Sequence, residues 1–124
     1  QETKEIIIID HKSSEYPLTK KGSVKKKKIK DYDSYKKQLY LYAEQVFNEY
    51  GIYPKKIEWN YFKEQQGLSL PFVKEEFEDA KTWAIDTIEE IYKEENFLPN
   101  LDYFYCHNLC GFRNSCDYKM MGGV

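Results

Sequence analysis

The sequence predicts an α/β fold, in which the strands of a central sheet are connected through helices. Three stretches predict it: a run of β-branched residues over 5–10, an amphipathic stretch over 33–50, and an alternating stretch over 56–63. A strand, a helix and a strand in this order form a βαβ-like crossover. With 124 residues, the chain has room for one domain with a modest core.

The first expected strand covers residues 5–10, which read EIIIID. Consecutive β-branched residues without polar alternation favour a strand that is buried on both faces in the middle of a sheet. A central strand needs a neighbour on each side, but only one other convincing strand follows, over 56–63. The remaining partners are therefore expected from residues upstream of Gln1 or from another chain. The apolar positions of the second strand are Ile57, Trp59 and Tyr61, which alternate with Glu58, Asn60 and Phe62.

The first expected helix covers residues 33–50, because apolar residues recur there with the period of an α-helix. Asp33 or Ser34 is expected to cap its start, Gly51 to end it and Pro54 to prevent its resumption. The expected apolar stripe consists of Leu39, Tyr42, Ala43, Val46, Phe47 and Tyr50.

A second helix is expected from about Val73 to Glu95, after a turn around Gly67–Pro71. Its polar face is rich in glutamate, which is typical of a solvated helix surface. An irregular aromatic tail follows Pro99. The expected apolar stripe of this helix consists of Phe77, Ala80, Ala84, Ile88, Ile91 and Tyr92.

The charges are distributed unevenly around a net charge of −2, with +5 over residues 1–63 and −7 over residues 64–124. Much of the positive excess lies between the first strand and the first helix. This lysine run is either a solvated loop or a surface that contacts nucleic-acid phosphates. It comprises Lys20, Lys21, Lys25, Lys26, Lys27, Lys28 and Lys30. The nearby Tyr16, Tyr32 and Tyr35 are candidates for stacking on unpaired bases.

The longest uninterrupted aliphatic run, Ile6–Ile9, is far shorter than the ~20 residues of a membrane-spanning helix. We therefore expect a soluble, cytoplasmic protein without a membrane partner.

Three cysteines, Cys106, Cys110 and Cys116, lie close together near the end of the chain. An odd number argues against a disulfide framework and leaves a soft-metal site or three unligated thiols. Thiolates bind zinc or iron–sulfur clusters. His107 could complete a zinc site, although its position next to Cys106 makes joint ligation awkward.

An acidic residue and a lysine follow directly on the first strand, as Asp10-His11-Lys12. Because strand side chains alternate, Asp10 and Lys12 are expected on one face and the His11 side chain on the other. A carboxylate and the His11 backbone carbonyl can bind Mg²⁺, and an ammonium beside the metal can orient water and stabilise charge on a phosphate. The alternative is a surface ion pair at the end of a strand.

Gln38 and Tyr42 are four residues apart on the first helix and therefore share a face. By themselves they could be a partly exposed glutamine beside a core tyrosine. Their order favours a functional interpretation, because they follow the buried strand, the Asp-x-Lys motif and the basic segment.

The runs IIIIDHK and DSYKKQLYLYAEQV resemble the RecB-like branch of the PD-(D/E)XK nuclease superfamily, in which an acidic-x-Lys strand precedes a helix with Q-x-x-x-Y. The cysteine spacing resembles that of AddB-type and CRISPR-associated RecB-like exonucleases. Their final five-residue gap matches, whereas the first gap has three residues here instead of two.

The resemblance implies a restriction-endonuclease-like core, a mixed central sheet flanked by helices, that lacks its N-terminal elements. Residues 1–64 would form the strand–helix–strand catalytic core of this single partial nuclease domain, and residues 65–124 the C-terminal helix and cysteine tail. It further implies that Asp10 and the His11 carbonyl bind Mg²⁺ or Mn²⁺, that Lys12 activates water, and that Gln38 and Tyr42 line the substrate site. The three cysteines would hold a 4Fe-4S cluster with a fourth, upstream cysteine.

The expected function is a metal-dependent DNA nuclease, an exonuclease on single strands or duplex ends, with DNA and a helicase or recombination protein as the expected partners. The upstream histidine, acidic ligand and first cysteine of the family pattern have no counterpart among the 124 residues. An upstream part of the protein or another chain would have to complete the site. The alternatives are an inactive nuclease-like DNA-binding or scaffolding subunit and a zinc-binding interaction module.

Overall fold

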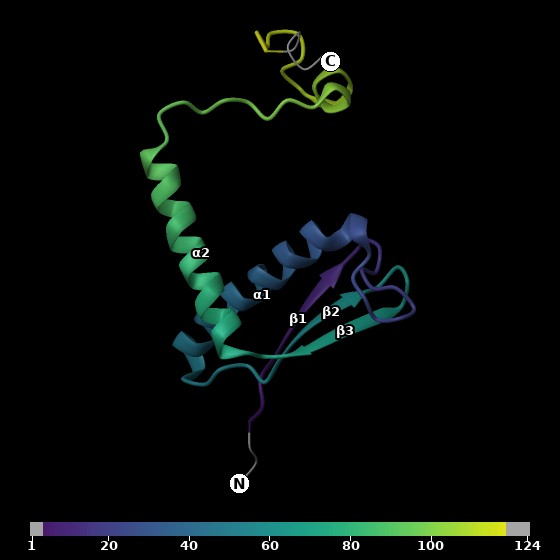
Figure 1. The fold of residues 1–124 in the computed structure, drawn as a ribbon, viewed down its shortest axis with the longest axis vertical. Coiled ribbons are helices and arrows are strands. Elements are labelled where there is room, and N and C mark those ends of the chain that lie inside the picture. Colours follow the sequence, from purple (N-terminus) through teal and green to yellow (C-terminus); the bar gives the residue numbers. More distant parts are fainter. Residues whose placement is uncertain (1–3, 119–124) are drawn as a thin grey trace. The chain divides into compact units, whose positions relative to one another are not determined.

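The computed structural model describes residues 4–118, and the chain forms two compact units, Gln1–Ile88 and Glu89–Val124, which are described separately. The first unit contains a sheet and two helices, of which the second helix continues into the second unit (Figure 1). Its elements are β1 (Ile7–Lys12), the 3-10 turn η1 (Lys26–Lys28), α1 (Ile29–Tyr50), β2 (Lys56–Tyr61), β3 (Gln66–Pro71) and α2 (Lys74–Lys93). The predicted α/β class is therefore confirmed.

The sheet has three strands in the order β1-β2-β3. β1 and β2 pair in parallel and are connected along the chain through α1, whereas β2 and β3 are antiparallel. The predicted strand–helix–strand crossover is thus confirmed, and the sheet is mixed. Asp10 lies opposite Trp59 and Lys12 opposite Tyr61, which places the Asp-x-Lys motif beside two buried aromatic residues of β2.

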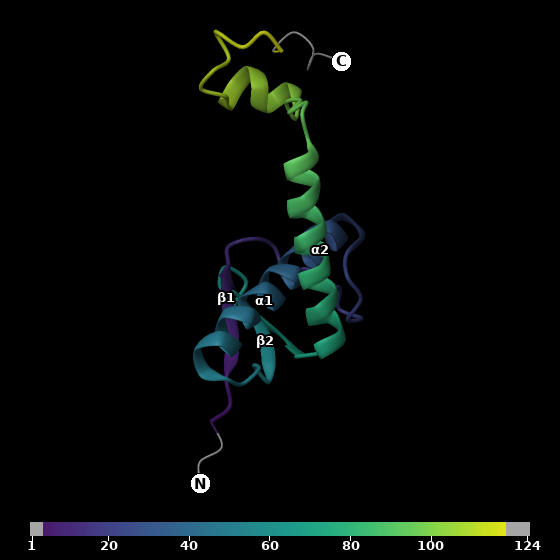
Figure 2. The same ribbon diagram turned by 90° about the vertical axis from the view of Figure 1, so that its left-hand side faces the viewer.

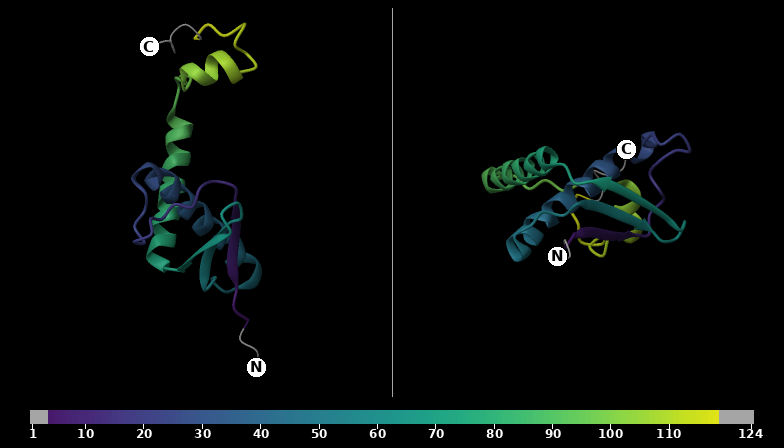
Figure 3. Two further views of the ribbon diagram at one scale, coloured as in Figure 1. Left: turned by 90° about the vertical axis from the view of Figure 1, so that its right-hand side faces the viewer. Right: turned by 90° about the horizontal axis from the view of Figure 1, so that it is seen from below.

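Among the described residues, β1 is an edge strand and not the central strand that the sequence predicted. Its exposure alternates along the strand, and Ile7 and Ile9 are 42% and 53% exposed. Only β2 pairs with it, and helices cover only one face of the sheet within this unit (Figure 3). Because the second neighbour of β1 was expected from upstream of Gln1 or from another chain, burial on both faces stays a prediction.

The structure contains a strand, β3, where the sequence predicted a turn around Gly67–Pro71. The chain instead reverses just before it, over residues 62–65, where Gln65 adopts a left-handed φ of 52°. β3 pairs with β2 at the edge of the sheet, and its proline stands at the last position. Proline is tolerated there because no further strand needs its missing N–H.

Helix α1 begins four residues earlier than predicted, so Asp33 and Ser34 lie inside the helix and do not cap it. Lys28, the last residue of η1, occupies the N-cap position of α1 without a capping side-chain bond. The end is as predicted, because Gly51 takes a left-handed φ of 72° and its N–H donates to the Phe47 carbonyl.

The core-facing side of α1 is rotated from the predicted stripe. Leu39 and Ala43 are buried as predicted, but the buried tyrosine is Tyr40, while Tyr42 is 47% exposed. The rotation follows from α2, which packs beside α1 (Figure 2) and gives Tyr40 a partner. The core comprises Leu39, Tyr40, Ala43, Ile57, Trp59, Tyr61, Leu68, Phe77 and Ala80.

Helix α2 agrees closely with its predicted range, and its Phe77 and Ala80 are buried. The later positions of the predicted stripe, Ile88, Ile91 and Tyr92, are more than half exposed, so the apolar stripe is covered only in the first half of the helix. None of the helices within residues 4–118 is long and apolar enough to cross a bilayer.

The second unit has little regular structure after α2, as the sequence predicted for the tail. One π-helical turn, η2 (Tyr105–Leu109), carries Cys106 and His107. The three cysteines are free and partly buried.

Candidate active site

Asp10 and Lys12 lie on the face of β1 that α1 covers, as the alternation of strand side chains predicts. The Lys12 ammonium lies 2.7 Å from Asp10 Oδ2, and the two side chains are only 15% and 24% exposed. The pair is therefore not a freely solvated surface ion pair, and its partial burial strengthens the attraction between the two charges.

Lys12 connects this pair to α1. Its ammonium donates to Gln38 Oε1 at 3.2 Å, and Gln38 Nε2 donates to the Tyr42 hydroxyl at 2.9 Å. The Lys12 nitrogen also lies 3.9 Å from the centre of the Tyr35 ring. The structure thus brings together the four predicted side chains, which we call the Asp10–Tyr42 chain after its two ends.

Aromatic side chains adjoin the Lys12 end of these contacts, since Tyr35 lies against the Lys12 ammonium and Tyr61 lies opposite Lys12 in the sheet. Burial, and secondarily the neighbouring Tyr35, raises the pKa of Tyr61 to about 12, so this phenol stays neutral at physiological pH. Tyr16 packs edge-on against Tyr61, and Tyr32 lies against Trp59. Tyr16 and Tyr32, two of the three predicted base-stacking tyrosines, are therefore engaged with the core.

Asp10 Oδ2 is the atom best suited to a hard cation. It is buried and, although it lies beside the Lys12 ammonium, it accepts no hydrogen bond of good geometry from the described residues. A carboxylate oxygen with this unused capacity fits Mg²⁺ or Mn²⁺, which prefer oxygen ligands. Residues 4–118 nevertheless contain no group of three or more His, Cys, Asp or Glu side chains that could hold a metal.

The His11 side chain points to the other face of the sheet, as predicted. Its Nδ1 and Asn60 Nδ2 are hydrogen-bonded at 3.1 Å. The imidazole is thus directed away from Asp10, and only the backbone of His11 can serve the site.

The lysine run divides into paired and unpaired residues. Glu15 binds Lys25 at 2.8 Å and Lys27 at 3.2 Å, and hydrogen bonds from first Lys25 and then Lys27 lower the pKa of Glu15 to about 2. Lys28 lies 3.6 Å from Asp31. The remaining members are exposed and have no acidic partner within the described residues: Lys20, Lys21, Lys26 and Lys30.

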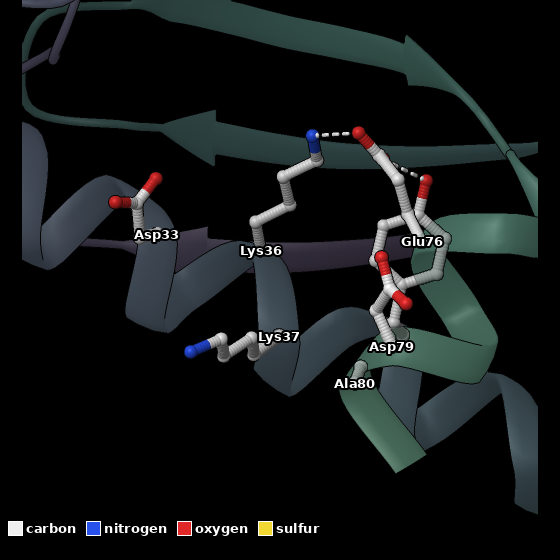
Figure 4. A pocket seen from close by; sticks show the side chains of 7 residues that line it. Asp33, Lys36, Lys37, Glu76, Asp79 and Ala80 are labelled. Atoms are coloured by element: carbon white, nitrogen blue, oxygen red, sulfur yellow. Dashed lines mark hydrogen bonds and ion pairs between the residues drawn. The ribbon is translucent and has the colours of Figure 1, made fainter. Parts of the chain in front are cut away.

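A hollow of about 220 Å³ lies between α1 and α2, and Figure 4 shows its side chains. Glu76 of α2 accepts hydrogen bonds there from Lys36 and from the Tyr40 hydroxyl, the latter at 2.7 Å. Burial opposes the ionisation of Glu76, but these two donors outweigh it and lower its pKa. Neither Asp10 nor Lys12 lines this hollow, and its central acid is already paired. We therefore interpret it as the contact that fixes α2 on α1.

A second hollow, of about 370 Å³, adjoins Lys12, Gln38 and Tyr42 and also takes in Tyr35, Lys37 and Trp83. Trp83 comes from α2 and was not singled out from the sequence. It lies one position away from the predicted stripe of that helix, and only the packing of α2 beside α1 brings it to Lys12. No local pattern signals such a contact between distant segments.

The cysteines do not form a ligand group in the structure. Within residues 4–118, no set of three potential ligands converges in the tail. His107 stacks on the Tyr103 ring, with 4.2 Å between the ring centres, and its Nδ1 donates to the Tyr103 carbonyl at 2.9 Å. Cys106, Cys110 and Cys116 are partly buried thiols in this arrangement.

Comparisons of the chain with models of protein families, with curated proteins and with solved structures gave no match. The geometry of the Asp10–Tyr42 chain is therefore the basis of the function proposed below.

Proposed function

We propose that this protein is a metal-dependent DNA nuclease of the RecB-like type, which hydrolyses phosphodiester bonds in single strands or at duplex ends. The observation that carries the proposal is the Asp10–Tyr42 chain. A carboxylate and an ammonium in contact, partly buried, and held by a glutamine and a tyrosine from the following helix, form an arrangement that suits phosphoryl chemistry.

Asp10 binds the metal ion in this proposal, with the backbone carbonyl of His11 as a second oxygen ligand. Mg²⁺ or Mn²⁺ at this position supplies Lewis acidity towards water and the phosphate. Because one carboxylate seldom holds Mg²⁺ firmly, a further acidic ligand is expected from outside residues 4–118, in the same protein or in a partner chain.

Lys12 stabilises negative charge on the phosphate and orients the attacking water. Its contact with Asp10 places the ammonium next to the metal ligand. Gln38 acts through Lys12, because its carbonyl oxygen accepts from the ammonium and restricts the lysine to one position. Tyr42 in turn accepts from the Gln38 amide nitrogen and so fixes which way the amide faces.

The exposed lysines without acidic partners would contact DNA phosphates without reading the bases. Among the described residues of the run, Lys20, Lys21, Lys26 and Lys30 suit this role better than Lys25 and Lys27, whose charge Glu15 already offsets.

The cysteine tail would hold a 4Fe-4S cluster through Cys106, Cys110 and Cys116, with zinc as the other occupant. Protein purified without oxygen should contain iron and sulfide. Stoichiometric zinc without iron would favour the zinc-binding module, and the absence of both metals would contradict a soft-metal site.

A second candidate keeps the fold but not the chemistry: a nuclease-like DNA-binding or scaffolding subunit. The single carboxylate of the site within residues 4–118 favours it. The ion pair and the glutamine that holds it favour catalysis, because binding DNA requires neither of them.

The test is cleavage of end-labelled single-stranded and duplex DNA by the full-length protein with Mn²⁺. Asp10→Ala and Lys12→Ala should each slow cleavage by about 100-fold or more while DNA binding stays within a few-fold. The matched control is Lys55→Ala, which removes a lysine from an exposed ion pair with Glu5. Cleavage retained in Asp10→Ala would contradict the proposal, and DNA binding without cleavage by the unmodified protein would favour the scaffolding subunit.

A further inference from the structure

The hollow beside Lys12 combines features that the proposed catalytic side chains do not need. Lys12, Gln38 and Tyr42 line its α1 side, and Trp83 of α2 lines it from across. Its volume of about 370 Å³ is large enough for a planar ring system. It opens directly onto the side chains that would contact the scissile phosphate.

Two aromatic side chains in this hollow are only half covered. Trp83 is 45% exposed and Tyr42 is 47% exposed, whereas Trp59, the other tryptophan of the chain, is 1% exposed in the core. Within residues 4–118, no other aromatic ring stacks on Trp83. An exposed indole in a hollow is costly to leave in water and offers a large flat surface to a ligand.

A cation accompanies the indole. The Lys37 ammonium lies 4.6 Å from the centre of the Trp83 ring, and among the described residues Lys37 has no acidic partner. Together with Lys12, it gives the hollow positive charge beside the half-exposed indole. Proteins bind single-stranded nucleic acid by this combination, because bases stack on the rings and ammonium groups contact the phosphates.

Two contacts that precede Trp83 in α2 hold this helix against α1. Glu76, about two helical turns before Trp83, is held by Lys36 and Tyr40, and Lys81 binds Glu44 of α1 at 3.0 Å. The distance between the indole and the Gln38–Tyr42 face of α1 is therefore set by these contacts and is present before any ligand binds.

We propose that Trp83 and Lys37 form a binding site for one unpaired nucleotide of a single strand, with the base stacked on Trp83 and its phosphate beside Lys37. This inference rests on the proposed function, since it places the nucleotide next to the phosphate held at Lys12. It makes Trp83 a specificity residue: a paired base in a duplex is covered by its neighbours and cannot reach the indole, so the site favours single strands and frayed ends.

Intrinsic fluorescence tests the site without relying on cleavage, because Trp83 is the exposed one of the two tryptophans among these 124 residues and the difference between Trp83→Ala and the unmodified protein gives its share of the signal. The full-length protein is titrated in EDTA with a single-stranded oligothymidylate and with a blunt duplex of equal length. The single strand should quench the exposed tryptophan. Trp83→Ala should remove this quenching and weaken single-strand binding by about tenfold, with duplex binding unchanged.

Two further variants separate stacking from folding and from charge. Trp83→Phe keeps a smaller aromatic face and should lose less affinity than Trp83→Ala, whereas Ile85→Ala, a half-exposed residue on the same helix, should bind like the unmodified protein. Lys37→Ala should reduce the dependence of log Kd on log salt by about 0.7 for the single strand.

Single-strand binding that is equal in Trp83→Ala and the unmodified protein would overturn this inference, and so would a single strand that leaves the tryptophan fluorescence unchanged. Neither result depends on cleavage by the unmodified protein, which tests the proposed function separately. Quenching and a loss of affinity in Trp83→Ala would support the nucleotide site even in a protein that does not cleave.

Discussion

Replacing Tyr40 by phenylalanine should destabilise the first unit, because the Tyr40 hydroxyl joins the two helices that bring Trp83 and Gln38 together. The hydroxyl donates to Glu76 Oε2 at 2.7 Å and accepts from the Val73 N–H at 3.1 Å. Tyr40→Phe keeps the ring, so packing against the neighbouring Phe72 is retained and only these two hydrogen bonds are lost.

The magnitude follows from the two bonds. A hydrogen bond to a charged group contributes about 1.5–3 kcal/mol when buried, and partial exposure of Glu76, at 39%, places this one near the lower end. The Val73 N–H loses its partner as well, which costs up to about 1 kcal/mol if water replaces the hydroxyl only in part. We therefore expect the free energy of unfolding to fall by about 2 kcal/mol.

Urea unfolding at pH 7, followed by circular dichroism, measures this loss. Tyr50→Phe is the matched control, because Tyr50 lies on the same helix, is 61% exposed and makes no hydrogen bond through its hydroxyl within the described residues. It should change the free energy of unfolding by less than about 0.5 kcal/mol. A Tyr40→Phe protein as stable as this control would refute the reasoning.

The pH dependence gives a second check on the same contact. The pKa of Glu76 is lowered in the folded protein, so its contribution to stability is present above the ordinary glutamate value of 4.5 and is lost as the pH falls through the folded value. The difference between Tyr40→Phe and the unmodified protein should therefore shrink in acid. A difference that stays constant down to pH 2 would contradict a charged Glu76 as the acceptor.

Two other variants test the basic segment and the end of α1. Glu15→Gln removes the acidic partner of Lys25 and Lys27. It should strengthen the binding of single-stranded DNA by about two- to fivefold and make this binding depend more steeply on salt, as measured by fluorescence anisotropy. Unchanged affinity would show that the two lysines do not face DNA. Because the pKa of Glu15 is held at about 2, the unmodified protein should show no change in this pairing between pH 5 and 8. Gly51→Ala places a residue with a Cβ atom at a left-handed φ of 72°, and no atom lies within 4 Å of that Cβ, so only the backbone conformation is strained. The free energy of unfolding, measured by thermal unfolding, should fall by about 1 kcal/mol. An unchanged value would contradict the left-handed C-cap.

The sequence predicted the strand–helix–strand unit, the shared face of Asp10 and Lys12 and the shared face of Gln38 and Tyr42, because these features depend on local periodicity. Alternation along β1 alone places Asp10 and Lys12 on one face, and four-residue spacing alone places Gln38 beside Tyr42. Their contact across elements followed once α1 covered that face of the sheet.

The errors arose where distant segments decide the outcome. β3 has a glycine, a serine and a proline in six residues, and it becomes a strand through pairing of Leu68 with Trp59 and Leu70 with Ile57. Tyr40 is buried in place of Tyr42 because Glu76 and Val73 of another segment satisfy its hydroxyl. Both tyrosines suit an amphipathic helix, so periodicity could not choose between them.

The central claim is that Lys12 and Gln38 act together in cleavage, and a double-mutant cycle tests it most directly. Rates of single-strand cleavage with Mn²⁺ are measured for Lys12→Ala, Gln38→Ala and the double variant. We expect Lys12→Ala to lose about 10²–10³-fold and Gln38→Ala about tenfold. Because Gln38 acts through the Lys12 ammonium, the double variant should cleave no more slowly than Lys12→Ala alone. A further tenfold loss in the double variant, or no loss in Lys12→Ala, would contradict the account.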